Sequence, residues 1–238
     1  YADRLYQLPL GVVGIAIGIV LLPELSRTLI NKNINEGQNA FNRALEFSLL
    51  LTIPSAIALI IIPVSLISVL FERGMFTKTD SISTAHALAI YGLGLPAFVL
   101  QKVLQPLYFA REDTKSPFRF AIFAMILNVS LAIILSFYFG FLSAAIGTTV
   151  SSWAMIFLLW SGCRGMGQAT KIDFRLKKNL PLIIASSILM GIIIYLVQLI
   201  LINNLNAPNI RYFSLFILIF SGIISYIFFI NLFGVISK

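Results

Sequence analysis

Long apolar runs without charge constrain this chain more than any other feature. Residues 8–22 contain no ionisable side chain, and similar runs recur along the 238 residues. A helix needs about 20 mainly apolar residues to cross the hydrocarbon core of a bilayer. Hydrophobic residues make up 59% of the chain and charged residues only 11%, against roughly one quarter charged in soluble domains. The sequence therefore predicts an all-α integral membrane protein.

Seven segments are long and apolar enough to span a bilayer. The predicted spans are 5–27, 44–70, 83–109, 117–138, 140–162, 180–202 and 212–234. Prolines at positions 9, 54, 63, 96 and 106 lie well inside them. Each proline removes one helical hydrogen bond and frees a carbonyl, which must face protein or water rather than lipid. We therefore expect kinked helices that enclose a cavity or move.

Lysine and arginine are distributed unevenly between the two ends of these spans. Twelve lie near 28–43, 110–116 and 163–179, at the span ends facing these connectors, and at the C-terminus. Four lie at the opposite ends, and Lys102 lies inside a span. Because cytoplasmic loops carry the excess of positive charge, the richer side and the C-terminus are predicted to be cytoplasmic. The net charge of +8 then reflects contact with an anionic leaflet, and no nucleic-acid partner is expected.

The first predicted span carries a polar head and a face of small residues. At 3.6 residues per turn these fall on one stripe, which comprises Asp3, Arg4, Gln7, Gly11, Gly14 and Gly18. An arginine costs about 3 kcal/mol at the bilayer centre, and its planar guanidinium binds phosphate oxygens in pairs. One interpretation is that Asp3 orients Arg4 and that Arg4 binds an anionic ligand. The alternative is that Arg4 extends to the interface while the glycines pack against a neighbouring helix.

Other polar residues within the spans are few. Lys102 either attracts an anion into a cavity or extends its ammonium group toward the cytoplasmic interface. Asn128 and Thr148 are candidate cation ligands, although no deep carboxylate completes the set and such residues often only bond neighbouring helices. His86 and Cys163 each stand alone, so neither a metal site nor an acid and base pair can be assembled. The sequence favours a transporter of an anionic substrate over an enzyme, with no cofactor.

Two stretches carry a recognisable pattern. Residues 1–27, YADRLYQLPLGVVGIAIGIVLLPELSR, and residues 102–117, KVLQPLYFAREDTKSP, resemble the MurJ (MviN) family of lipid II flippases. This family belongs to the multidrug/oligosaccharidyl-lipid/polysaccharide (MOP) exporter superfamily. The resemblance runs along essentially the whole chain and implies the C-terminal half of a protein of fourteen spans. The start at Tyr1 rather than Met agrees with a fragment, which we expect not to transport on its own.

The resemblance also implies a domain organisation and a substrate. Residues 1–163 would form the C-terminal lobe, 164–179 a basic cytoplasmic connector, and 180–238 two additional helices with a groove for a prenyl tail. The expected partners are membrane lipids, the N-terminal lobe, and lipid II, an undecaprenyl diphosphate-linked disaccharide peptide used for peptidoglycan synthesis. The expected location is the bacterial inner membrane.

By the same resemblance, several residues of this chain acquire roles in transport. Arg4 and Asp3 would line a cationic cavity for the diphosphate headgroup, with Gln7 and Lys102 as further contacts. Pro9 and the glycines would let the helix bend. Asn128 matches members that bind a coupling cation, but Ala132, one turn on, is apolar and departs from them. The expected energy source is the membrane potential or an ion gradient.

Three other functions stay open from the sequence. A polysaccharide-lipid flippase or a drug/cation antiporter would share the architecture. The antiporter should show a deep carboxylate, and the polysaccharide flippase should lack the ADR and FAREDTKSP stretches. A membrane-embedded transferase acting on a lipid-linked sugar would need a cluster of carboxylates or histidines near one surface.

Overall fold

The computed structural model describes residues 1–30, 34–163, 166–167, 170–205, 207 and 210–235, with side chains for all of these except 15–22, 25–26, 28–30 and 34. The described residues form eight helices. They are α1 (Ala2–Ile30), α2 (Ile34–Ile61), α3 (Pro63–Phe71), α4 (Lys78–Phe109), α5 (Lys115–Phe139), α6 (Leu142–Cys163), α7 (Phe174–Leu205) and α8 (Arg211–Leu232). The predicted all-α class is confirmed.

The long helices account for the predicted membrane spans. Six of them, α2 and α4 to α8, are long and apolar enough to cross a membrane on the residues described. α1 has 29 residues, which at 1.5 Å per residue is about 43 Å, more than the hydrocarbon thickness of a bilayer. The protein is therefore a multi-pass membrane protein with about seven spans.

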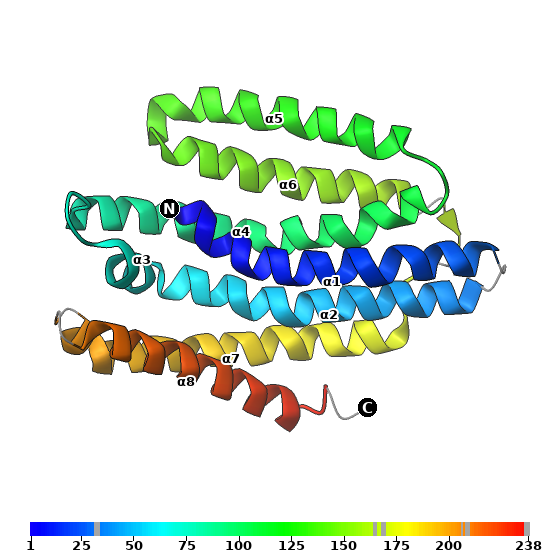
Figure 1. Ribbon diagram of the computed structural model, residues 1–238. Coiled ribbons are helices and arrows are strands. Elements are labelled where there is room, and N and C mark those ends of the chain that lie inside the picture. The colour runs from blue at the N-terminus through cyan, green and yellow to red at the C-terminus, as the bar shows by residue number, and fades with distance from the viewer. Residues whose placement is uncertain (31–33, 164–165, 168–169, 206, 208–209, 236–238) are drawn as a thin grey trace.

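The long helices lie side by side (Figure 1). α5 and α6 form one edge, α7 and α8 the other edge, and α1, α2 and α4, which all pack on one another, lie between them. The connectors that carry the most cations meet at one end of this bundle. There Arg111 donates a hydrogen bond to the carbonyl of Met166, and Gln38 donates to the carbonyl of Lys171. The predicted grouping of these connectors on one side is confirmed.

The predicted span 44–70 was wrong as a single helix. α2 ends at Ile61, and a separate nine-residue helix, α3, begins at Pro63. Proline has no N–H to continue the helix, and Ile62 leaves helical geometry with φ −115° and ψ 33°. α2 also begins ten residues earlier than predicted, at Ile34, because the polar side chains at its start find partners in the connector before α7.

α6 donates two side-chain hydrogen bonds to the backbone of α4. Thr149 donates its hydroxyl to the carbonyl of Ile90 at 3.0 Å, and the indole N–H of Trp153 donates to the carbonyl of Leu93 at 3.1 Å. Leu93 lies three residues before Pro96, in the turn where the proline ring disturbs the helical hydrogen bonds, and Ile90 lies one turn earlier. A side chain of a neighbouring helix thus bonds a backbone acceptor in the turn before the proline.

Candidate functional site

Aromatic contacts hold the first turns of α1 against α3 and α4. The ring of Tyr1 lies 4.9 Å from that of Phe71 and 5.1 Å from that of Phe76. The ring of Tyr6 lies 4.8 Å from that of Tyr91 on α4. The half-buried ring of Tyr6 therefore lies on the side of α1 that packs on α4.

Asp3, Arg4 and Gln7 are all exposed on α1. Asp3 lies in the first turn, where a carboxylate interacts favourably with the helix dipole. Among the residues described, no ion pair or hydrogen bond joins the side chains of Asp3 and Arg4. Orientation of Arg4 by Asp3 therefore stays a prediction, while the guanidinium itself is accessible to a ligand.

The structure brings Lys102 to the stripe that begins at Arg4. A Cβ built on Gly14 would lie 3.6 Å from Cγ of Lys102, so the stem of the lysine passes over the glycine. Lys102 is exposed, and Gly14 lies ten residues beyond Arg4, about 15 Å along α1. Two cations thus lie along one face of α1, at different depths.

The glycines of the stripe are not tightly packed where they are described. A Cβ on Gly11 would meet nothing within 4 Å, and one on Gly14 would make only an ordinary contact with Lys102. Gly18 lies within α1, but its surroundings are outside the described residues. Close helix packing therefore does not explain Gly11, and a role of Gly11, Gly14 and Pro9 in bending stays a prediction.

An apolar cavity of about 520 Å³ lies between α1, α2, α7 and α8. Its wall includes Leu5 and Pro9 of α1, Leu50 and Pro54 of α2, Met190 of α7, and Gly222 and Tyr226 of α8. Leu5 and Pro9 point about 100° and 140° around α1 from Arg4. The first turns of α1 thus separate an exposed cation from an apolar cavity. The family resemblance implies a groove on the last two helices, but the walls that α1 and α2 contribute were not predicted.

Asn128 and Thr148 do meet, but as packing partners. The amide of Asn128 donates to the hydroxyl of Thr148 at 3.4 Å, and this hydroxyl donates to the carbonyl of Ala144 at 2.8 Å. They line a recess of about 300 Å³ with Gln101 and Gln105, whose described lining contains no carboxylate. Neutral donors already engaged with each other fit a bare cation poorly. A coupling cation at Asn128 and Thr148 stays a prediction that these contacts do not favour.

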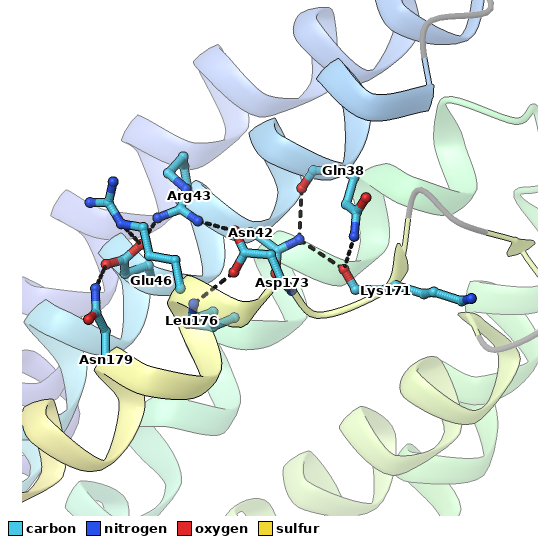
Figure 2. Close-up of polar contacts among 9 residues, drawn as sticks. Gln38, Asn42, Arg43, Glu46, Lys171, Asp173, Leu176 and Asn179 are labelled. Atoms are coloured by element: carbon cyan, nitrogen blue, oxygen red, sulfur yellow. Dashed lines mark hydrogen bonds and ion pairs between the residues drawn. The ribbon is translucent and has the colours of Figure 1, made fainter. Parts of the chain in front are cut away.

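A cluster of polar side chains joins the start of α2 to the start of α7 (Figure 2). We call it the α2–α7 polar cluster, and its members are Gln38, Asn42, Arg43, Glu46, Lys171, Asp173, Arg175 and Asn179. Arg43 forms ion pairs with both Glu46 and Asp173. The pair with Glu46 joins residues three apart on one helix, whereas the bond to Asp173, 130 residues away, was not predicted.

Every polar atom of the Asn42 side chain in this cluster has a partner. Its Nδ2 donates to the carbonyls of Gln38 and Lys171 at 2.8 and 2.9 Å, and its Oδ1 accepts from the N–H of Asp173 at 3.0 Å. Asn179 donates to the nearly buried carboxylate of Glu46 at 2.5 Å. A satisfied network of this kind fixes one register between two helices. The cluster is therefore structural, and its two arginines are paired with carboxylates.

The comparisons with known proteins agree with these features. A family model described as "Lipid II flippase MurJ" matches residues 1–234. The chain belongs to the MurJ family. A curated MurJ relative from Rhizobium tropici, named a probable lipid II flippase, is 44% identical over 196 residues, which are 82% of this chain and 37% of that protein. Another, from Vibrio cholerae, is 36% identical over 167 residues, which are 70% of this chain and 32% of that protein.

A solved MurJ structure shares the fold. It is titled "Lipid II flippase MurJ, inward closed conformation", has a TM-score of 0.80 and 28% sequence identity, and covers 98% of this chain and 46% of the other. The chain thus spans less than half the length of the MurJ proteins it matches here.

Proposed function

We propose that this chain forms part of a flippase that moves lipid II across the bacterial inner membrane for peptidoglycan synthesis. The observation that carries the proposal is the start of α1, which exposes Arg4 on one side and lines an apolar cavity with Leu5 and Pro9 on another. A lipid-linked diphosphate needs both surfaces, one for its anionic headgroup and one for its prenyl chain. The names of the curated relatives support lipid II as the substrate.

Each candidate residue then has a distinct role. The guanidinium of Arg4 donates two parallel hydrogen bonds to diphosphate oxygens, which a permanently charged planar group does well. Lys102 attracts the same anion deeper along α1, and Asp3 and Gln7 contact or orient the headgroup. Pro9, Gly11, Gly14 and Gly18 let α1 bend as the protein alternates between its two open states.

The wider setting follows from the family and from charge. An N-terminal lobe supplies the other wall of the substrate cavity, and the membrane potential or an ion gradient drives transport. No bond of the substrate is made or broken, so the protein is a transporter rather than an enzyme. The C-terminus faces the cytoplasm, as does the end of the helix bundle that carries the connectors rich in lysine and arginine.

Substitution of Arg4 tests the proposal in the complete transporter that contains this chain. Arg4→Ala should lower lipid II transport about tenfold to a hundredfold, because each charge-assisted hydrogen bond in a partly dehydrated cavity contributes roughly 1.5–3 kcal/mol. Arg4→Lys keeps the charge but loses the planar donor pair, so it should retain part of the activity. The measurement is outward exposure of lipid II in cells that depend on each variant, per molecule of transporter in the membrane.

Lys78→Ala is the matched control, since Lys78 is an exposed cation at the first residue of α4 and lies outside the stripe. It should leave transport unchanged. Wild-type exposure of lipid II by Arg4→Ala would overturn the role of Arg4. Full activity of Arg4→Lys together with low abundance of Arg4→Ala would instead support the interfacial anchor considered from the sequence.

A further inference from the structure

Pro54 leaves one backbone acceptor of α2 without its helical partner. In an α-helix the N–H of residue 54 bonds the carbonyl of residue 50, and proline has no N–H to donate. Leu50 and Pro54 both line the apolar cavity between α1, α2, α7 and α8. A bare carbonyl facing an apolar cavity is unfavourable, because neither water nor lipid satisfies it there.

Tyr226 of α8 satisfies this acceptor. Its phenolic hydroxyl donates to the carbonyl of Leu50 at 2.6 Å, across 176 residues of sequence. The Tyr226 side chain also lines the cavity, and the residue is only 9% exposed. The hydroxyl therefore supplies, from another helix, the hydrogen bond that Pro54 cannot make.

This bond is also the polar tie between α8 and α2 in the part of the chain that the structure describes. At its start α8 is held elsewhere, where Arg211 donates to the carbonyl of Glu72 at 3.4 Å, beyond the end of α3. Along its middle α8 packs on α7, where a Cβ on Gly222 would lie 2.6 Å from Ile194. Without Tyr226, the facing walls of the cavity on α2 and α8 would be joined by apolar contact alone.

We propose that Tyr226 is a positioning residue that couples α8 to α2 at Pro54. Its hydroxyl replaces the missing amide of Pro54, which has two consequences. The cavity lining presents no unpaired acceptor at Leu50, so the cavity suits an apolar chain. The walls contributed by α2 and α8 stay joined, so the cavity moves with α2 when the transporter changes state. Only the link to transport rests on the proposed function.

The pairing of Tyr226 with Pro54 can be tested by restoring the missing donor. Four forms of the complete transporter are compared in detergent: unmodified, Tyr226→Phe, Pro54→Ala, and the double variant. Tyr226→Phe should lower the midpoint of thermal unfolding by about 3 °C or more, because it leaves the Leu50 carbonyl without a hydrogen-bond donor. In the Pro54→Ala background the same change should have at most a quarter of that effect, since the amide of residue 54 now bonds Leu50.

A distance measurement tests the tie itself and does not need Pro54→Ala to fold. Spin labels are placed at Phe47 on α2 and Phe228 on α8, which are 48% and 60% exposed. Tyr226→Phe should broaden the distribution of distances between the labels at least twofold. Pro54→Ala should not narrow it again in the double variant, because the carbonyl is then satisfied but the helices are no longer joined.

Tyr195→Phe is the control, since Tyr195 on the adjacent helix α7 is 52% exposed and lies outside this cavity. It should change neither the midpoint nor the distances. Equal effects of Tyr226→Phe with and without Pro54, or an unchanged distance distribution in Tyr226→Phe, would overturn the proposal. Neither measurement uses lipid II, so a failed Arg4 experiment would leave this result standing, and the reverse also holds.

Discussion

The start of α1 and the α2–α7 polar cluster both place an arginine near a carboxylate, yet only the second pair is bonded. Arg43 forms ion pairs with Glu46 and Asp173 and joins two helices. Arg4 is exposed, and among the described residues no ion pair joins it to Asp3. The contrast teaches that charge in a membrane protein has two uses. A cation whose donors are satisfied holds helices together, whereas one left open on a helix face is available to a ligand.

Removal of Glu46 from the α2–α7 polar cluster should cause the largest loss of stability. Glu46→Ala should lower the free energy of unfolding by about 3 kcal/mol, because it removes a nearly buried carboxylate bonded by Arg43 and Asn179. Arg4→Ala should change this free energy by less than about 0.5 kcal/mol, as for other surface substitutions. The measurement is equilibrium unfolding of the complete transporter in detergent.

Glu36→Ala is the matched control for Glu46, since Glu36 is exposed in the first turn of the same helix. It should cost no more than about 0.5 kcal/mol. Equal loss of stability in Glu46→Ala and Glu36→Ala would show that the cluster is a surface feature. A large loss in Arg4→Ala would show that Arg4 is structural and would remove the contrast.

Alanine substitutions at two glycines should change the stability by a smaller amount. Gly191→Ala should destabilise the protein by about 1 kcal/mol, because its Cβ would lie 2.7 Å from side-chain atoms of Ile57 and Ile61 on α2. Gly11→Ala should be neutral or stabilise by up to about 1 kcal/mol, since its Cβ meets open space and alanine favours a helix. Comparison of the two unfolding free energies tests whether α1 has an open face. Equal destabilisation by both variants would indicate that Gly11 is packed.

The smallest effect concerns a carboxylate outside the spans. Ser116 donates to Asp113, through its side chain and through its backbone N–H at 3.0 Å, and this holds the pKa of Asp113 below its usual value of 3.8. A pKa lowered in the folded state means that the ionised group stabilises the fold above pH 3.8, and that this stability is lost as the pH falls below it.

In Asp113→Asn the free energy of unfolding should therefore fall slightly less between about pH 4 and pH 2 than in the unmodified protein. The measurement is unfolding in detergent at each pH. Glu112→Gln, at the neighbouring exposed position, is the control and should leave the profile unchanged. An unchanged profile in Asp113→Asn would mean that the hydrogen bonds from Ser116 do not persist in solution. The effect is small because water screens a charge at the protein surface more than it screens the nearly buried carboxylate of Glu46.

The helical membrane class, the approximate spans and the family all follow from the sequence alone. Each of these depends on local features, namely apolar runs of sufficient length and short motifs around Arg4 and Lys102. The stripe on α1 was equally accessible, since helical periodicity places residues three or four apart on one face. The pairing of Arg43 with Glu46, three residues apart, was predictable for the same reason.

Only the tertiary structure decided which distant residues meet. Nothing in the local pattern indicated that Asp173 would bond Arg43, or that Lys102 would lie over Gly14. The prolines at 54 and 63 both lie inside one predicted span, yet the first lies inside a helix that continues and the second begins a new helix. At Pro54 the hydroxyl of Tyr226 donates to the carbonyl of Leu50, which the proline leaves without its helical partner. Such partners come from other helices, so only the packing of the whole chain can supply them.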